Sequence, residues 1–127
     1  MHNDLIKEIK FDKNGLAPVI VQDHKNNQVL MLAYMNKEAL IETLSTGFMC
    51  YWSRSRKEFW RKGESSGHRQ KVVDAFIDCD NDTLLFTVDQ KVAACHEGYR
   101  SCFFRKIKDG KLEVIAKKIF DKEKVYK

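Results

Sequence analysis

Short runs of apolar, β-branched and aromatic residues, separated by turn residues, dominate this chain and favour a fold rich in strands. These runs are residues 18–22, 28–35, 49–53, 59–62, 71–80, 83–90 and 102–107. Residues 37–46 differ, because they are rich in helix formers, follow Asn36 as an N-cap and precede Gly47 as a stop. We therefore predict an α+β fold with a mainly antiparallel sheet and one clear helix; terminal helices are also compatible with the pattern.

The size and composition of the chain predict one globular domain over residues 1–127, with a hairpin and a basic tail at 106–127. The N-terminus lacks the pattern of a signal peptide, and the longest apolar run, 29–35, is too short to span a bilayer. We expect a cytoplasmic protein that does not associate with membranes. A net charge of +5 favours phosphate-bearing partners.

The most informative stretch is an acidic run at residues 78–82. If it continues a strand, Asp78 and Asp80 share one face and Cys79 points to the other. A bend at Asn81 would add Asp82, giving three oxygen donors that suit magnesium. An EF-hand is rejected because Thr83 and Asp89 stand where that loop needs glycine and glutamate. A polar turn with solvated aspartates remains the alternative.

Disulfides are rare in a reducing compartment, so the four cysteines point to core packing, metal ligation or catalysis. Cys95 and Cys102 flank a polar, glycine-containing segment that can bring two sulfurs to one ion. Cys79 would complete three soft ligands for zinc and leave one coordination position open, as catalytic zinc sites do. Buried or idle thiols are the alternative, and Cys50 fits that description best.

A basic strand and a flexible loop follow each other in the middle of the chain. Candidate phosphate ligands are arginine, lysine and serine side chains beside glycines that permit close backbone approach. They are Arg54, Arg56, Lys62, Ser65, Ser66 and Arg69. His68 and His96 each lie in a polar loop and are candidates for proton transfer near neutral pH, with His68 preferred.

Taken together, six blocks of sequence resemble the phosphoribosyl-AMP cyclohydrolases, enzymes of histidine biosynthesis, over about residues 14–105. The blocks are 15–23, 29–36, 51–56, 63–68, 78–82 and 94–98. The resemblance implies hydrolysis of the bond between N1 and C6 of the adenine ring in phosphoribosyl-AMP, by a homodimer that uses zinc and magnesium. It places Cys79, Cys95 and Cys102 on the zinc ligands and Asp78, Asp80 and Asp82 on the magnesium ligands. It also implies that each zinc site is shared between the two chains.

Three positions depart from the family pattern. Ser65 replaces the usual threonine and keeps the hydroxyl, Val92 lies near a usual glycine, and Glu97 replaces a threonine. Two other kinds of protein are alternatives to an enzyme. One is a zinc-stabilised module that binds single-stranded nucleic acid through Trp52, Trp60 and the arginines, and the other is a structural zinc protein. Neither explains the three aspartates, so we expect a small phosphorylated nucleotide, not nucleic acid, as the partner.

Overall fold

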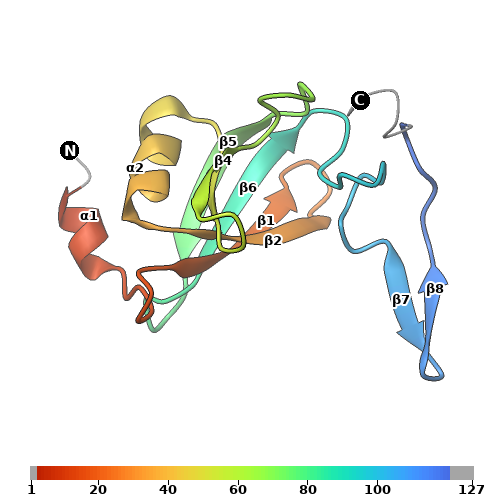
Figure 1. Cartoon of the computed structure of the whole chain (residues 1–127), viewed down its shortest axis with the longest axis horizontal. Coiled ribbons are helices and arrows are strands. Elements are labelled where there is room, and N and C mark those ends of the chain that lie inside the picture. The colour runs from red at the N-terminus through yellow and green to blue at the C-terminus, as the bar shows by residue number, and fades with distance from the viewer. Residues whose placement is uncertain (1–2, 121–127) are drawn as a thin grey trace.

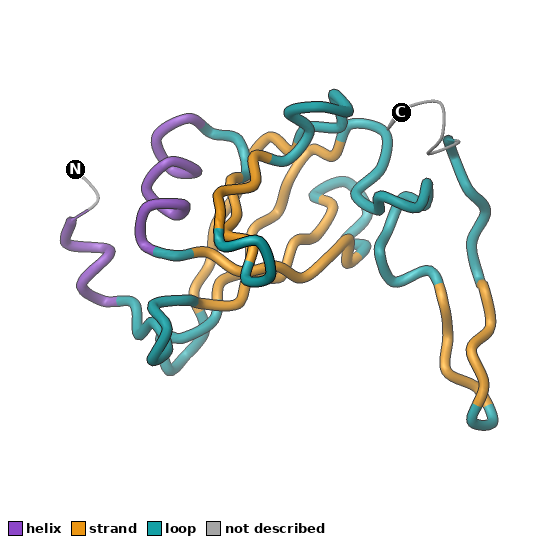
Figure 2. The backbone as a smooth tube through the Cα atoms, in the orientation of Figure 1, coloured by secondary structure: helices purple, strands orange, loops and turns teal. Residues whose placement is uncertain are grey.

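The computed structural model describes residues 3–120, which form an α+β fold of two helices and eight strands (Figures 1 and 2). In chain order the elements are α1 (Asn3–Glu8), β1 (Ala17–Asp23), β2 (Val29–Met35), α2 (Lys37–Thr46), β3 (Cys50–Ser53), β4 (Glu58–Arg61), β5 (Gln70–Ile77), β6 (Leu84–Gln90), β7 (Arg105–Lys108) and β8 (Lys111–Val114). No helix among residues 3–120 is long and apolar enough to cross a membrane.

A four-stranded sheet in the order β2-β1-β6-β5 forms the centre of the molecule. The pairs β1–β2 and β5–β6 are antiparallel, which agrees with the mainly antiparallel sheet predicted, but β1 and β6 run parallel. The two parallel strands are about sixty residues apart in the sequence, so no short turn connects them and the sequence does not predict their pairing. Alternate residues of β1 are fully buried, which places its inward face in the core.

Helix α2 covers one side of this core and begins and ends where the sequence predicts. The Asn36 side chain accepts a hydrogen bond from the backbone N–H of Ala39, and Gly47 ends the helix at a φ of 81°. Leu40 and Thr43 of the helix are buried, and the Thr43 hydroxyl donates to the Cys50 carbonyl while accepting from the Cys50 N–H. These bonds attach the helix to β3 and so fix the β3–β4 hairpin that follows.

The C-terminal hairpin β7–β8 extends away from the sheet (Figure 1). Its turn at Asp109-Gly110 agrees with the sequence, but its first strand begins at Arg105 instead of residue 102. Residues 102–104 are held differently, because the Cys102 N–H donates to the Leu30 carbonyl and Tyr99 stacks on Phe104. The lysine-rich tail beyond residue 120 lies outside the described residues.

Candidate active site

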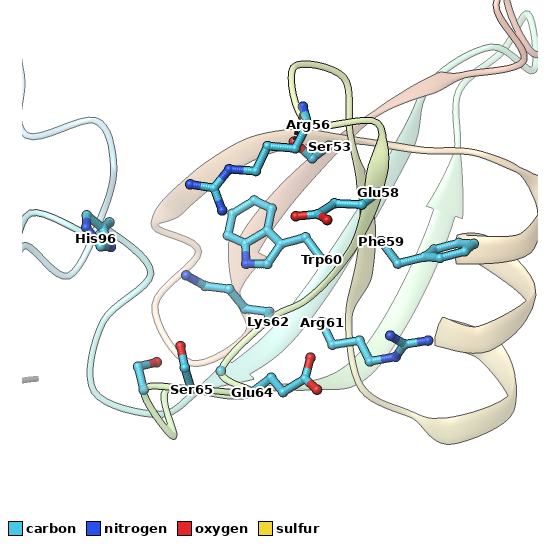
Figure 3. Close-up of a pocket in the computed structure, with 12 residues that line it drawn as sticks. Ser53, Arg56, Glu58, Phe59, Trp60, Arg61, Lys62, Glu64, Ser65 and His96 are labelled. Carbon is cyan, nitrogen blue, oxygen red and sulfur yellow. Dashed lines mark hydrogen bonds between the residues drawn. The ribbon is translucent and has the colours of Figure 1, made fainter. Parts of the chain in front are cut away.

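A cavity of about 620 Å³ opens beside the β3–β4 hairpin and the loop that follows it (Figure 3). Strand alternation decides which side chains enter it. Glu58, Trp60 and Lys62 extend to one side of β4, while Phe59 and Arg61 extend toward α2. Arg61 forms a bidentate ion pair with Glu42 of that helix, at 2.8 and 2.9 Å. Most of the residues that line the cavity are polar or charged, and its two aromatic residues are Phe59 and Trp60.

Four of the six candidate phosphate ligands line this cavity: Arg56, Lys62, Ser65 and Ser66. The loop carrying the serines turns at Gly63, where an added Cβ would lie 2.6 Å from the Arg69 backbone nitrogen at a positive φ of 83°. Only glycine fits that approach. The Ser66 hydroxyl accepts a hydrogen bond from the His68 N–H, which joins the serine loop to the candidate histidine.

The other two candidate ligands, Arg54 and Arg69, do not line the cavity. The Arg54 guanidinium lies 3.9 Å from the centre of the Tyr34 ring, and that of Arg69 lies 3.7 Å from the centre of the Phe48 ring. These cation–π contacts hold both side chains against the body of the same chain. The sequence shows the charges but not the aromatic neighbours that hold them.

Lys62 connects the cavity to the loop that carries two of the cysteines. It is only 7% exposed, and its Nζ donates to the Ala94 carbonyl at 2.6 Å. Burial lowers the pKa of this ammonium, and the thiols of Cys102 and Cys95 lie near enough to act on it in the opposite direction. The pocket and the cysteine pair are thus neighbours.

Cys95 and Cys102 lie close enough for their sulfurs to interact. Burial raises the pKa of the Cys102 thiol to about 11, and the charge of Cys95 adds to this effect. A thiol whose ionisation is disfavoured in this way is stabilised as a thiolate by a bound cation. Cys95 and Cys102 are close enough together to bind the same ion. Their soft sulfur donors suit zinc.

His68 is 6% exposed, and its Nδ1 has no hydrogen-bond partner among the described residues. Its ring meets the Phe120 ring edge to face at 4.7 Å. Burial, followed by the nearby Lys62 charge, lowers the pKa of His68 below its usual value. The imidazole is therefore neutral at pH 7. His68 is not among the residues that line the cavity, and its Nδ1 is inaccessible to solvent. His96 is exposed at the edge of the cavity.

The three aspartates come together in a turn and not along a strand. Strand β5 ends at Ile77, so the prediction that it continues to Asp80 is wrong. Asp78 Oδ1 accepts hydrogen bonds from the Asp82 and Thr83 N–H groups, which closes the turn, and Asn81 takes a positive φ of 65°. Asx turns of this kind end strands.

One carboxylate oxygen from each of Asp78, Asp80 and Asp82 lies within 4.8 Å of the others, which fits a divalent cation. Side-chain hydrogen bonds to Asp82 and Asp78 raise the pKa of Asp80. Burial acts to raise the pKa of Asp78, but hydrogen bonds from the backbone N–H groups of Asp82 and Thr83 bring it below its usual value. A hard divalent cation bound by the three carboxylates would offset the repulsion between their negative charges.

Cys79 and the acidic turn lie at the end of the β5–β6 hairpin opposite to Cys95 and Cys102. The turn joins Ile77 to Leu84, whereas the cysteine loop follows Gln90. A strand of this length spans roughly 20 Å. Among residues 3–120, the aspartates form the one set of three possible metal ligands that lie together. Within one chain, Cys79 is therefore separate from the other two cysteines.

A buried ion pair that the sequence analysis missed anchors the cysteine loop. Arg100 Nη2 lies 2.6 Å from Asp23 Oδ2, and Nη1 donates to the carbonyls of Gln90 and Val92 at 2.8 Å. Burial works to raise the pKa of Asp23, but the Arg100 hydrogen bond and charge bring it below its usual value. The Gln90 amide also donates to the carbonyls of Lys91 and Ala93. In the sequence, only two features point to this ion pair. Arg100 lies between Cys95 and Cys102, and Asp23 lies at the end of a strand.

Comparison with known proteins agrees with these features. A sequence model of the phosphoribosyl-AMP cyclohydrolase family matches residues 31–104. The chain is 55% identical over 123 residues to the phosphoribosyl-AMP cyclohydrolase of Chlorobium chlorochromatii, covering 96% of this chain and 90% of that protein. It is 54% identical over 125 residues to that of Methanospirillum hungatei, covering 98% and 93%.

A bifunctional histidine-biosynthesis protein of Thermoanaerobacter pseudethanolicus is 52% identical over 123 residues, which cover 97% of this chain and 57% of that longer protein. The matched region includes the β3–β4 hairpin, the serine loop, the acidic turn and the cysteine loop. The chain therefore belongs to the phosphoribosyl-AMP cyclohydrolase family.

Proposed function

We propose that this chain opens the adenine ring of 1-(5-phosphoribosyl)-AMP by hydrolysing the bond between N1 and C6, a step of histidine biosynthesis. The observation that carries the proposal is the position of Lys62. Its buried ammonium contacts the Ala94 carbonyl beside the cysteine pair, while its stem lines a cavity that also contains Arg56 and two serine hydroxyls. Phosphate-binding groups and a candidate metal site are thus adjacent.

Cys95 and Cys102, with Cys79 of a second copy of the chain, would hold zinc. The donor set fits, because three thiolates leave one tetrahedral position open for water. When bound, zinc lowers the pKa of a coordinated water so that hydroxide is available at neutral pH. Lys62 lies near both sulfurs of one chain, and its positive charge favours the ionised form of Cys102.

His68 is our candidate for proton transfer. The ring is neutral at pH 7 and its Nδ1 has no partner among the described residues, so it can accept a proton from the attacking water. The water oxygen adds to C6. The proton then passes to N1 as the N1–C6 bond breaks, and the exocyclic amine stays on the new carboxamide. His96, exposed at the cavity edge, is the second candidate.

The aspartates would hold magnesium, whose remaining positions suit a substrate phosphate. Within one chain this turn and the Cys95–Cys102 pair lie at opposite ends of β5–β6, so a site containing both needs two copies. The edge strand β5 supports such an assembly, because Val73 and Phe76 are 44% and 51% exposed. Exposed apolar side chains on an edge strand are typical of an interface.

The test is turnover of phosphoribosyl-AMP by purified protein, before and after a chelator removes zinc and after zinc is restored, with magnesium constant. We expect activity to disappear and return. The product should retain the exocyclic amine, so no ammonia should be released. Release of ammonia would indicate a deaminase, and absence of turnover by folded, zinc-loaded protein would refute the proposed reaction.

A further inference from the structure

Trp60 is a large aromatic side chain in the cavity wall to which the proposed mechanism gives no role. It is 42% exposed, although Tyr51, its cross-strand neighbour, is completely buried. In Figure 3 the indole lies in the middle of the cavity, with Glu58 and Lys62 on either side along the strand. An indole left open to solvent inside a polar cavity offers a flat apolar surface to a ligand.

The indole is fixed in place. Its ring lies 5.3 Å from the Tyr51 ring, at an interplanar angle of 46°. Tyr51 is itself held, because its hydroxyl donates to Gln70, whose amide donates to Gln90 at 2.7 Å. A surface held by a buried hydrogen-bonded network loses little entropy when a ligand stacks on it.

The charges around the indole match the proposed substrate. A substituent on N1 of adenine gives an amidinium cation until the exocyclic nitrogen loses a proton. The face of an indole carries negative potential and attracts such a cation. Glu58 enters the cavity from the same side of β4 and adds negative charge. Lys62 Nζ donates to the Ala94 carbonyl and lies 5.2 Å from the centre of the indole ring, so the indole already has one cation against it. Arg56, Ser65 and Ser66 are then available to bind the phosphates.

We propose that Trp60 is the platform on which the adenine ring stacks, and that it selects the N1-substituted, cationic ring over unsubstituted adenine. This inference rests on the proposed function, since it concerns the same cavity and substrate. It assigns to this side chain a specificity for the charge of the ring, which is separate from recognition of the second phosphate that phosphoribosyl-AMP carries and AMP lacks.

The experiment measures dissociation constants of 1-methyladenosine 5′-monophosphate and of AMP with zinc- and magnesium-loaded protein. We expect the native protein to prefer the methylated nucleotide. Trp60→Leu should reduce that preference about tenfold, and Trp60→Phe should retain part of it. Trp52→Leu is the matched control, because Trp52 packs edge to face on Phe59 and does not line the cavity.

A second measurement does not depend on removing Trp60. The chain has two tryptophans, so in Trp52→Phe all tryptophan emission comes from Trp60. Saturation with the methylated nucleotide should quench it. Tryptophan emission that does not change on saturation would overturn the inference. So would a native protein that binds the methylated nucleotide no better than AMP, or a Trp60→Leu variant that still prefers the methylated nucleotide. In those cases, turnover of phosphoribosyl-AMP by native protein would leave the proposed function standing, whereas its absence would refute that function separately.

Discussion

Replacing Asp23 with asparagine tests whether the buried ion pair holds the cysteine loop. The Asp23 side chain is 2% exposed and that of Arg100 is 30% exposed, with 2.6 Å between the charged atoms. Asparagine keeps the shape but removes the charge. We expect Asp23→Asn to lower the free energy of unfolding by about 2 kcal/mol. Breaking a fully buried ion pair would lower it further, but Arg100 is partly solvated and keeps its two carbonyl partners. For a chain of this length, a loss of about 2 kcal/mol lowers Tm by about 7 °C.

The matched control is Asp89→Asn. Asp89 pairs with Lys25 at 3.7 Å, and the two side chains are 51% and 68% exposed. Exposed pairs of this kind contribute little, so Tm should change by less than about 2 °C. Thermal unfolding followed by circular dichroism measures both variants. Equal melting temperatures for Asp23→Asn and Asp89→Asn would refute the reasoning.

The same pair predicts a dependence on pH. The folded-state pKa of Asp23 is lowered, so its stabilising effect is present above the unfolded-state value near 3.8 and is lost as pH falls through the folded value. The difference in unfolding free energy between native protein and Asp23→Asn should stay constant between pH 5 and 7 and shrink in more acidic solution. A difference that grows toward acid would contradict the assigned role.

Three further predictions concern single residues. His68→Ala should lower kcat about 100-fold if Nδ1 transfers a proton, with exposed His24→Ala as control; near-native kcat would remove His68 from the mechanism. Asp80→Asn should raise the magnesium concentration for half-maximal activity at least about tenfold, and an unchanged requirement would exclude the acidic turn. Val92→Gly should raise Tm by about 2–4 °C, because the β-branched side chain at a φ of 61° is strained, while Val92→Ala should gain less; a lower Tm for the glycine variant would contradict this.

The parts of the fold that depend on local signals could be predicted from the sequence. Asn36 and Gly47 mark the ends of α2, and turn residues mark the hairpins. The parallel pairing of β1 with β6 was not predictable, because it depends on contacts between distant segments. The acidic run bends at Asp78 because its carboxylate captures backbone N–H groups, which competes with strand pairing.

The candidate site could be predicted by residue type and only partly by arrangement. The sequence identifies Arg56, Lys62 and the serines as polar groups near glycines, and the structure places them around one cavity. It could not show that Arg54 and Arg69 contact aromatic rings, or that His68 is buried, because burial depends on the folded surface. The pairing of Asp23 with Arg100 could not be predicted from the residue types alone, because 77 positions in the sequence separate the two residues.

The central claim is that one active site combines Cys79 of one chain with Cys95 and Cys102 of another. The most direct test mixes Cys79→Ser and Cys102→Ser chains, refolds them together with zinc, and measures turnover of phosphoribosyl-AMP. Each variant alone should be inactive. Random pairing in a two-fold dimer leaves one intact site in each mixed pair, so the mixture should recover about a quarter of native activity. A mixture as inactive as its components, or an active Cys79→Ser protein, would contradict the shared site.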